Sequence, residues 1–212
     1  ILAIGIPASI NNMLMSTSNI VINNLLKDHD DMAVAGLGVA MKVNMIVVML
    51  LIGLGVGIQP LLGYCYGAGK KKRYMQVMKF SLALAFSLSV VMTIICYLGA
   101  APLVRAFLED KEAFDFGFRF SRIYIYSGPI LGLLFVFINA IQSTGAALPS
   151  LILSISRQGL LFLPILFSVD AIFGTAKTLA MAQPITDYCA TLLAFILFII
   201  TMKTRFKVKE DW

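Results

Sequence analysis

The chain has 212 residues, of which 59% are hydrophobic and 13% charged, and its formal net charge is +6. Soluble domains carry charge on about a quarter of their residues, so this composition excludes an ordinary soluble domain and indicates a membrane protein. It also argues against a nucleic-acid partner, because the cations are gathered between apolar runs instead of covering a solvated face with aromatic residues among them.

Six stretches of the chain are long and apolar enough to cross a bilayer, whose core of about 30 Å requires roughly 20 residues of helix. Polar or glycine-bearing segments separate them. In chain order, the expected spans cover approximately residues 1–26, 33–66, 77–103, 118–143, 148–170 and 176–202. We therefore predict an all-α polytopic membrane protein, in which residues 1–212 form a single six-helix transmembrane lobe in contact with the lipid bilayer.

One face of the first span is polar. Five residues recur at intervals of three or four, which places them on one side of a helix: Ser9, Asn12, Ser16, Asn19 and Asn23. Each alone could serve only to hydrogen-bond a neighbouring helix, a common use of Ser and Asn in membrane bundles. The whole stripe favours a water-filled cavity, and Pro7 on the same span permits a kink.

The second span closes in "IQPLLGYCYGAGKKKRY", residues 58–74. This stretch is not a phosphate-binding loop of the Walker type, because its glycine interval is one residue too long and Lys71 replaces the hydroxyl that binds magnesium. We predict that Gln59 and Pro60 loosen the helix end, that the glycines turn the chain, and that the basic run anchors it on the water side.

The cations assign the ends of the spans to sides of the membrane, because cytoplasmic loops carry an excess of Lys and Arg. The loop after the second span and the tail after the sixth fall on the same side and hold Lys70, Lys71, Lys72, Arg73, Lys79, Lys203, Arg205, Lys207 and Lys209. We predict that both termini are cytoplasmic, in a plasma membrane of the bacterial inner-membrane kind. The amphipathic segment 105–119 is expected to form an interfacial helix on the outer side.

The fourth span repeats the polar theme more weakly. Its members at helical spacing are Gly128, Gly132, Phe135, Asn139 and Gln142. Helix packing accounts for the two glycines. Asn139 and Gln142 are expected to contact water or substrate, and Pro129 to permit bending.

Three ionisable residues lie within spans: Lys42, Arg157 and Asp187. Each costs about 2.5–3.5 kcal/mol on insertion scales and is expected to face a cavity or a partner. Counted from opposite sides at about 1.5 Å per residue, Arg157 and Asp187 both fall near mid-membrane, so we predict that they pair. Such a pair often serves only to fix how two helices dock. Lys42 has no carboxylate on its own helix, and it could snorkel, meet a helix C-terminus or repel cationic cargo.

No site for covalent chemistry or metal binding stands out. Cys65, Cys96 and Cys189 lie far apart in apolar context, without the spacing of a metal or redox site. The only histidine, His29, lies in the loop "KDHDD", where a solvated turn is a better account than a metal site. We expect no cofactor and no enzymatic activity.

Several runs resemble the second half of MATE (multidrug and toxic compound extrusion) transporters. "GLGVGIQPLLGYCYGAGKKKR" is similar to the segment that closes the eighth helix of the family, and "GIPASINNMLMSTSNIVINN" to the seventh helix. "LPSLILSISRQGLLFLPILF" and "AQPITDYCATLLAFILF" resemble the eleventh and twelfth helices. The resemblance implies two six-helix lobes around a cleft, with this chain as the second lobe and an N-terminal lobe of the same polypeptide missing, which would explain the abrupt start at Ile1.

The family resemblance also implies a function. Members export bulky, amphiphilic and often cationic small molecules in exchange for Na⁺ or H⁺. Some branches carry coupling acids in the second lobe, and the corresponding positions here are Met15 and, approximately, Leu133, which carry no carboxylate. We therefore expect the coupling ion, H⁺ or Na⁺, to bind in the missing lobe. The polar stripe would be the cleft-facing side of the first span.

Two other functions stay open. A flippase or exporter of lipid-linked saccharides, from the wider superfamily, would need cations in its cleft to meet pyrophosphate, and only Lys42 and Arg157 are available. A membrane scaffold without transport activity would tolerate leucine substitutions in the polar stripe.

Overall fold

The computed structural model describes the backbone of residues 2–27 and 30–210, and the side chains of residues 13–27, 30–146, 148–153, 155–176 and 178–206. The elements are α1 (Leu2–Lys27), α2 (Asp31–Gly67), α3 (Lys71–Leu98), α4 (Ala100–Arg105), α5 (Lys111–Ile125), α6 (Gly128–Ser143), α7 (Ala147–Ile155), the π-helix η1 (Ser156–Leu161), α8 (Phe162–Phe173), α9 (Ala176–Leu179) and α10 (Ala182–Glu210). No strand occurs in the ranges described, so the all-α prediction is confirmed.

The helices are long and apolar enough for a polytopic membrane protein. Four helical stretches have the length and hydropathy of a membrane span: Asp31–Gly67, Lys71–Leu98, Leu148–Phe173 and Ala182–Phe206. The pair α5 and α6, bent by 52°, makes a fifth if it crosses as one unit. The first stretch is a 26-residue helix, α1, that falls outside this set. The apolar windows of the four spans are only 22–33% buried, which leaves most of their apolar surface for lipid.

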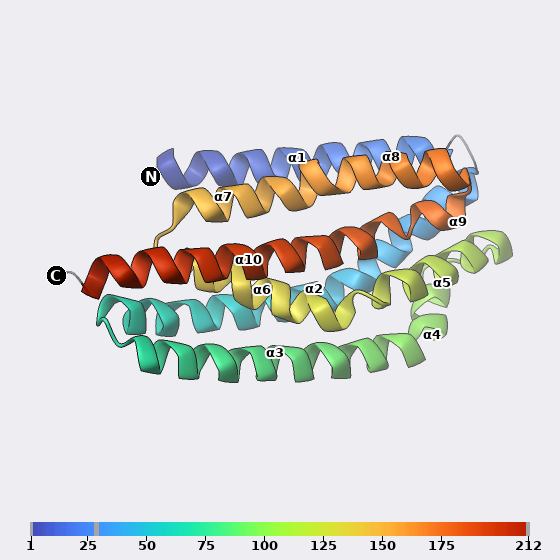
Figure 1. Cartoon of the computed structure of the whole chain (residues 1–212). Coiled ribbons are helices and arrows are strands. Elements are labelled where there is room, and N and C mark those ends of the chain that lie inside the picture. The colour runs from blue at the N-terminus through green and yellow to red at the C-terminus, as the bar shows by residue number, and fades with distance from the viewer. Residues whose placement is uncertain (1, 28–29, 211–212) are drawn as a thin grey trace.

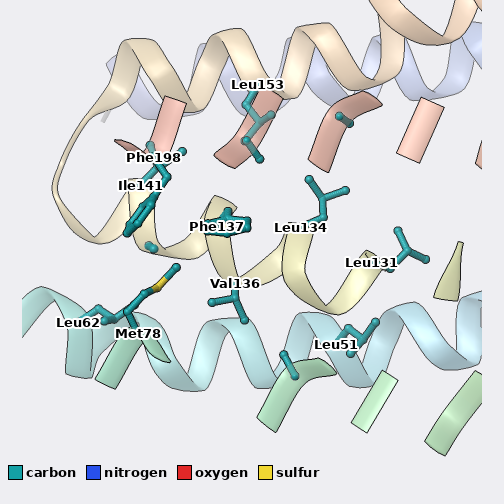
Figure 2. Close-up of a cluster of buried hydrophobic side chains, with 14 of the residues drawn as sticks. Leu51, Leu62, Met78, Leu131, Leu134, Val136, Phe137, Ile141, Leu153 and Phe198 are labelled. Carbon is teal, nitrogen blue, oxygen red and sulfur yellow. The ribbon is translucent and has the colours of Figure 1, made fainter. Parts of the chain in front are cut away.

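The axes of the long helices lie roughly parallel to one another (Figure 1). α1 lies beside the stretch formed by α7 and α8, while α2 and α6 lie between α10 and the outer helix α3. Buried side chains of α2, α3, α6 and α10 form the main core. Figure 2 shows Val136 of α6 directed toward α2, and Leu153 of α7 directed toward α10. A second core joins α1, α5, α8 and the beginning of α2.

The chain turns after α2 at a glycine, as predicted. α2 continues through Pro60 to Gly67, and the loosening expected at Gln59 and Pro60 stays a prediction. The turn is made by Gly69 with φ of 68°, and the Lys70 backbone N–H donates to the Cys65 carbonyl at 3.0 Å. This is the glycine-dependent stop that satisfies the last carbonyls of a helix. Gly69 is thus the glycine that this turn requires.

The segment expected to be an interfacial helix, 105–119, is divided in the structure. α4 ends at Arg105, and α5 begins at Lys111, where the Asp110 carboxylate caps it by accepting from the Glu112 N–H at 2.8 Å. α5 packs along the first half of α2, where a Cβ at Gly36 would lie 2.7 Å from the Gly117 nitrogen. The helix therefore docks on α2 and continues through the bend into α6.

Candidate functional site

An ion pair joins η1 to α10 in the interior of the bundle. Arg157 donates from Nε and Nη2 to Oδ1 of Asp187 at 3.2 and 3.0 Å. The side chain of Asp187 is 1% exposed and that of Arg157 is 17% exposed. The predicted pairing of these two residues is confirmed. The pair therefore links η1 to α10, two helices that lie far apart in the sequence.

Arg157 is the second residue of the π-helical turn η1. In η1 each turn is wider than in an α-helix, so the residues after it are rotated relative to those before it. The guanidinium points back toward α10 and α6, where it also lies 5.7 Å from the ring centroid of Phe135. Ser18 of α1 donates to the Gln158 carbonyl at 2.6 Å, which satisfies a backbone group within the irregular turn.

The two carboxylate oxygens of Asp187 differ in their hydrogen bonds. Oδ1 accepts from Arg157 and from the Gln183 amide, the latter at 3.4 Å. Oδ2 is buried and has no hydrogen-bond partner among the described residues. The buried hydroxyl of Tyr124 on α5 likewise has no partner there. An unpaired buried acceptor and an unpaired buried donor are each costly.

The polar face of α1 is partly exposed along its described part. Ser16 is exposed, and Asn19 and Asn23 are half-buried. The side chains of Pro7, Ser9 and Asn12 lie outside the described residues. The face of α1 that packs into the bundle carries Ser18, Ile22 and Leu26. The predicted stripe is therefore available to water or to another surface along its described part.

The two polar residues predicted on α6 have different surroundings. Gln142 is exposed. Asn139 is 7% exposed, donates to the Phe135 carbonyl of its own helix at 2.8 Å, and abuts Gly55 of α2 so closely that a Cβ there would collide with the amide. The expectation that Asn139 contacts water or substrate does not fit this placement, because the side chain fills the seam between α2 and α6.

The remaining predicted residues lie at helix ends or on outer surfaces. Lys42 is exposed, and its ammonium lies 5.2 Å from the ring centroid of Phe107, so its charge is met by an aromatic face. Gln59 is half-buried and Pro60 exposed within α2. Pro129 stands in the first turn of α6, at the bend that follows α5, and its carbonyl accepts from Ser89 at 3.1 Å.

Sequence reasoning missed Ser18, Gln183 and Tyr124. Ser18 lies off the polar stripe. Its position four residues before the apolar Ile22 could have placed it on the buried face of the helix. Gln183 precedes Asp187 by one helical turn, a spacing at which a helical amide and carboxylate meet. Tyr124 had no usable signal, because its burial depends on how α5 packs against the other helices.

No metal-binding chemistry is assembled in the described part of the chain, where no group of three His, Cys, Asp or Glu side chains could hold an ion. A surface hollow of about 530 Å³ is lined by Lys111, Glu112, Asp115, Phe116 and Arg119. These residues come from α5 alone and carry charges of both signs. The ion pair and the polar face of α1 therefore remain the principal polar features.

Long helices with lipid-facing apolar surface and a buried intramembrane ion pair define a polytopic α-helical membrane protein. The sequence profile of the MatE family matches residues 7–167. The chain belongs to the MatE family.

Curated relatives and solved structures agree with this assignment. The multidrug export protein MepA of Staphylococcus haemolyticus is 25% identical over 99% of this chain and 46% of its own length. MepA of Staphylococcus aureus strain MSSA476 is 26% identical over 93% of this chain and 44% of its own length. The chain thus spans about half the length of these relatives.

The same fold occurs in solved MATE transporters. The Vibrio cholerae transporter VcmN in its bent form superposes with a TM-score of 0.87 at 17% identity, covering 96% of this chain and 46% of VcmN. A MOP superfamily transporter from Pyrococcus furiosus superposes with a TM-score of 0.82 at 22% identity, covering 94% of this chain and 44% of the transporter. The fold is therefore that of one MATE lobe.

Proposed function

We propose that this chain is the C-terminal lobe of a secondary active antiporter that exports amphiphilic or cationic small molecules across a plasma membrane. The observation that carries the proposal is the likeness to relatives named multidrug export proteins over 93–99% of the chain. An N-terminal six-helix lobe of the same polypeptide would complete the transporter, since those relatives are about twice as long.

The exposed polar face of α1 supports a cleft on this side of the lobe. Ser16 is exposed and Asn19 and Asn23 are only half-buried, and polar groups turned toward hydrocarbon are costly. An aqueous cleft between two lobes removes that cost and offers hydrogen bonds to a passing compound. Gln142 is an additional exposed polar group on α6.

The proposed orientation places both termini of the chain in the cytoplasm. The turn between α2 and α3, the beginning of α1 and the end of α10 lie at the same end of the bundle (Figure 1). That end carries the basic run Lys70 to Arg73, and an excess of cations is typical of cytoplasmic loops.

We propose that the coupling ion, H⁺ or Na⁺, binds outside this chain. Met15 and Leu133 stand at the positions where the family resemblance places second-lobe acids. Within the described residues, the buried acid of the spans is Asp187, and Arg157 already neutralises it. An acid in the proposed first lobe would then carry the ion.

A lipid-linked saccharide flippase is a weaker candidate. Its pyrophosphate would need cations that are free to meet it. Lys42 faces Phe107, and Arg157 is bound to Asp187, so neither charge is directed at an anionic cargo.

Efflux of a fluorescent cation such as ethidium tests the proposed function. Cells that express the intact gene product are loaded with dye, and efflux is compared with and without a proton or sodium gradient. We expect gradient-dependent efflux, and its absence at normal expression would contradict the proposal. Asn19→Leu should abolish most efflux while expression stays normal, whereas a scaffold without transport activity would be indifferent to it.

A further inference from the structure

Cations gather at one end of the lobe, whereas the opposite end carries acids together with cations such as Lys111 and Arg119. The described acids outside the membrane interior lie at one end of the bundle, around the starts of α2 and α5 and the end of α8: Asp30, Asp31, Glu109, Asp110, Glu112, Asp115 and Asp170. At the opposite end, the turn between α2 and α3 and the end of α10 contribute exposed cations: Lys70, Lys71, Lys72, Arg73, Lys79, Lys203 and Arg205. We call these seven residues the basic rim.

An aromatic cluster joins the two parts of the basic rim into one surface. Phe206 of α10 is 3% exposed, and its ring meets Tyr66 of α2 and Tyr74 of α3 at centroid distances of 5.3 and 5.5 Å. The ammonium of Lys71 lies 5.9 Å from the Phe206 centroid. Cations separated by about 130 positions in the sequence therefore converge on the same rim of the bundle.

Six of the seven cations in the basic rim have no ion pair among the described side chains. They are Lys70, Lys72, Arg73, Lys79, Lys203 and Arg205. Three cations also occupy the first turn of α3, whose N-terminus has no side-chain cap and no acid. Positive charge at this end of a helix is unfavourable, so an external anion at this place would stabilise the arrangement.

We propose that the basic rim binds the headgroups of anionic phospholipids at the membrane surface. Clusters of four to eight Lys and Arg directly beside membrane helices attract anionic lipid. Here the rim surrounds the helix ends and follows the surface of the bundle, so the phosphates available to it are those of the adjacent leaflet. The aromatic cluster at its centre holds the end of α10 in place and keeps the cations at headgroup level.

Lipid retained on the purified intact gene product tests the proposal. The protein is incubated in detergent with equal amounts of phosphatidylglycerol and phosphatidylcholine, and bound lipids are counted by native mass spectrometry. We expect a clear preference for phosphatidylglycerol. Replacing both Lys203→Gln and Arg205→Gln should lower that preference up to about thirtyfold, at about 1 kcal/mol for each cation. The matched control, Lys111→Gln with Arg119→Gln, removes the same charges from the acidic end and should leave the preference unchanged.

Three results would overturn the proposal: equal retention of the two lipids, an equal effect of the rim and control variants, or displacement by inorganic phosphate beyond that of chloride at matched ionic strength. The last would assign the rim to a free phosphate.

If the rim variant does not fold, a salt series on the unaltered protein tests the proposal instead, because exposed charges are screened within about 10 Å at 0.1 M salt. A preference that does not weaken with salt contradicts the proposal. The assay needs no ion gradient, so its outcome is independent of the efflux result.

Discussion

Arg157 and Asp187 meet through a single carboxylate oxygen. Both donating nitrogens of the guanidinium reach Oδ1, at 3.2 and 3.0 Å, and the buried Oδ2 has no partner among the residues described. The pair lies at the contact of the π-helical turn η1 with α10. It therefore combines two features that cost free energy, an irregular helix and buried charge, at one place in the bundle.

Removing either partner of this pair should destabilise the protein. Asp187→Ala leaves Arg157 without its counter-charge, and we expect the free energy of unfolding to fall by about 3 kcal/mol, seen as a lower melting temperature in detergent. A charge-swapped double variant should be better folded or more active than either single variant. If it is no better, the pairing does not act as described.

A hydrophobic replacement of the pair separates stability from function. Arg157→Met combined with Asp187→Leu removes both charges and should leave the melting temperature close to that of the unaltered protein, since well-packed apolar residues often replace buried pairs without loss. If the pair only fixes helix docking, efflux should survive as well. Lost efflux at unchanged stability would show that the charges themselves are needed.

Two serines of α1 should behave differently on substitution. Ser18→Ala removes the hydrogen bond to the Gln158 carbonyl and should cost about 1 kcal/mol of stability, because an acceptor in η1 loses its donor. Ser16 is exposed, so Ser16→Ala should leave the melting temperature unchanged. Equal effects of the two substitutions would contradict the assignment of the buried and polar faces of α1.

Because α2 and α6 pack closely at Gly55, alanine should lower the stability of the protein at Gly55 but not at Gly53. A Cβ at Gly55 would collide with the Asn139 amide, whereas a Cβ at Gly53 meets nothing within 4 Å. Gly55→Ala should destabilise the protein by about 1–3 kcal/mol, and Gly53→Ala should be neutral or slightly stabilising because alanine favours helix. Adding Asn139→Ala to Gly55→Ala should restore part of the loss. A double variant no more stable than Gly55→Ala would argue against this contact.

Two glycines at the end of α2, Gly67 and Gly69, should respond differently to replacement by alanine. Gly69 adopts φ of 68°, a conformation that costs a residue with a side chain about 1–2 kcal/mol. Gly67 is helical and has open space around it. The melting temperature should therefore fall for Gly69→Ala and stay unchanged or rise for Gly67→Ala. The reverse order would contradict the described turn.

The sequence by itself determined the class of protein and the approximate limits of its helices. Hydropathy and length are local properties, so the apolar stretches could be located without knowing their neighbours. The pairing of Arg157 with Asp187 was also predictable, because depth follows from counting residues at a fixed rise per residue, and buried opposite charges at equal depth attract.

Only the tertiary structure decided which side of each helix faces which neighbour. Asn139 shared the polar spacing of its span but is turned into the seam beside Gly55, while Ser18, off the stripe, meets Gln158. Such contacts depend on the rotation of each helix about its axis, and the π-helical turn changes that rotation within one span. The convergence of Lys71, Phe206 and the end of α10 likewise required the fold, because it joins segments that the sequence holds far apart.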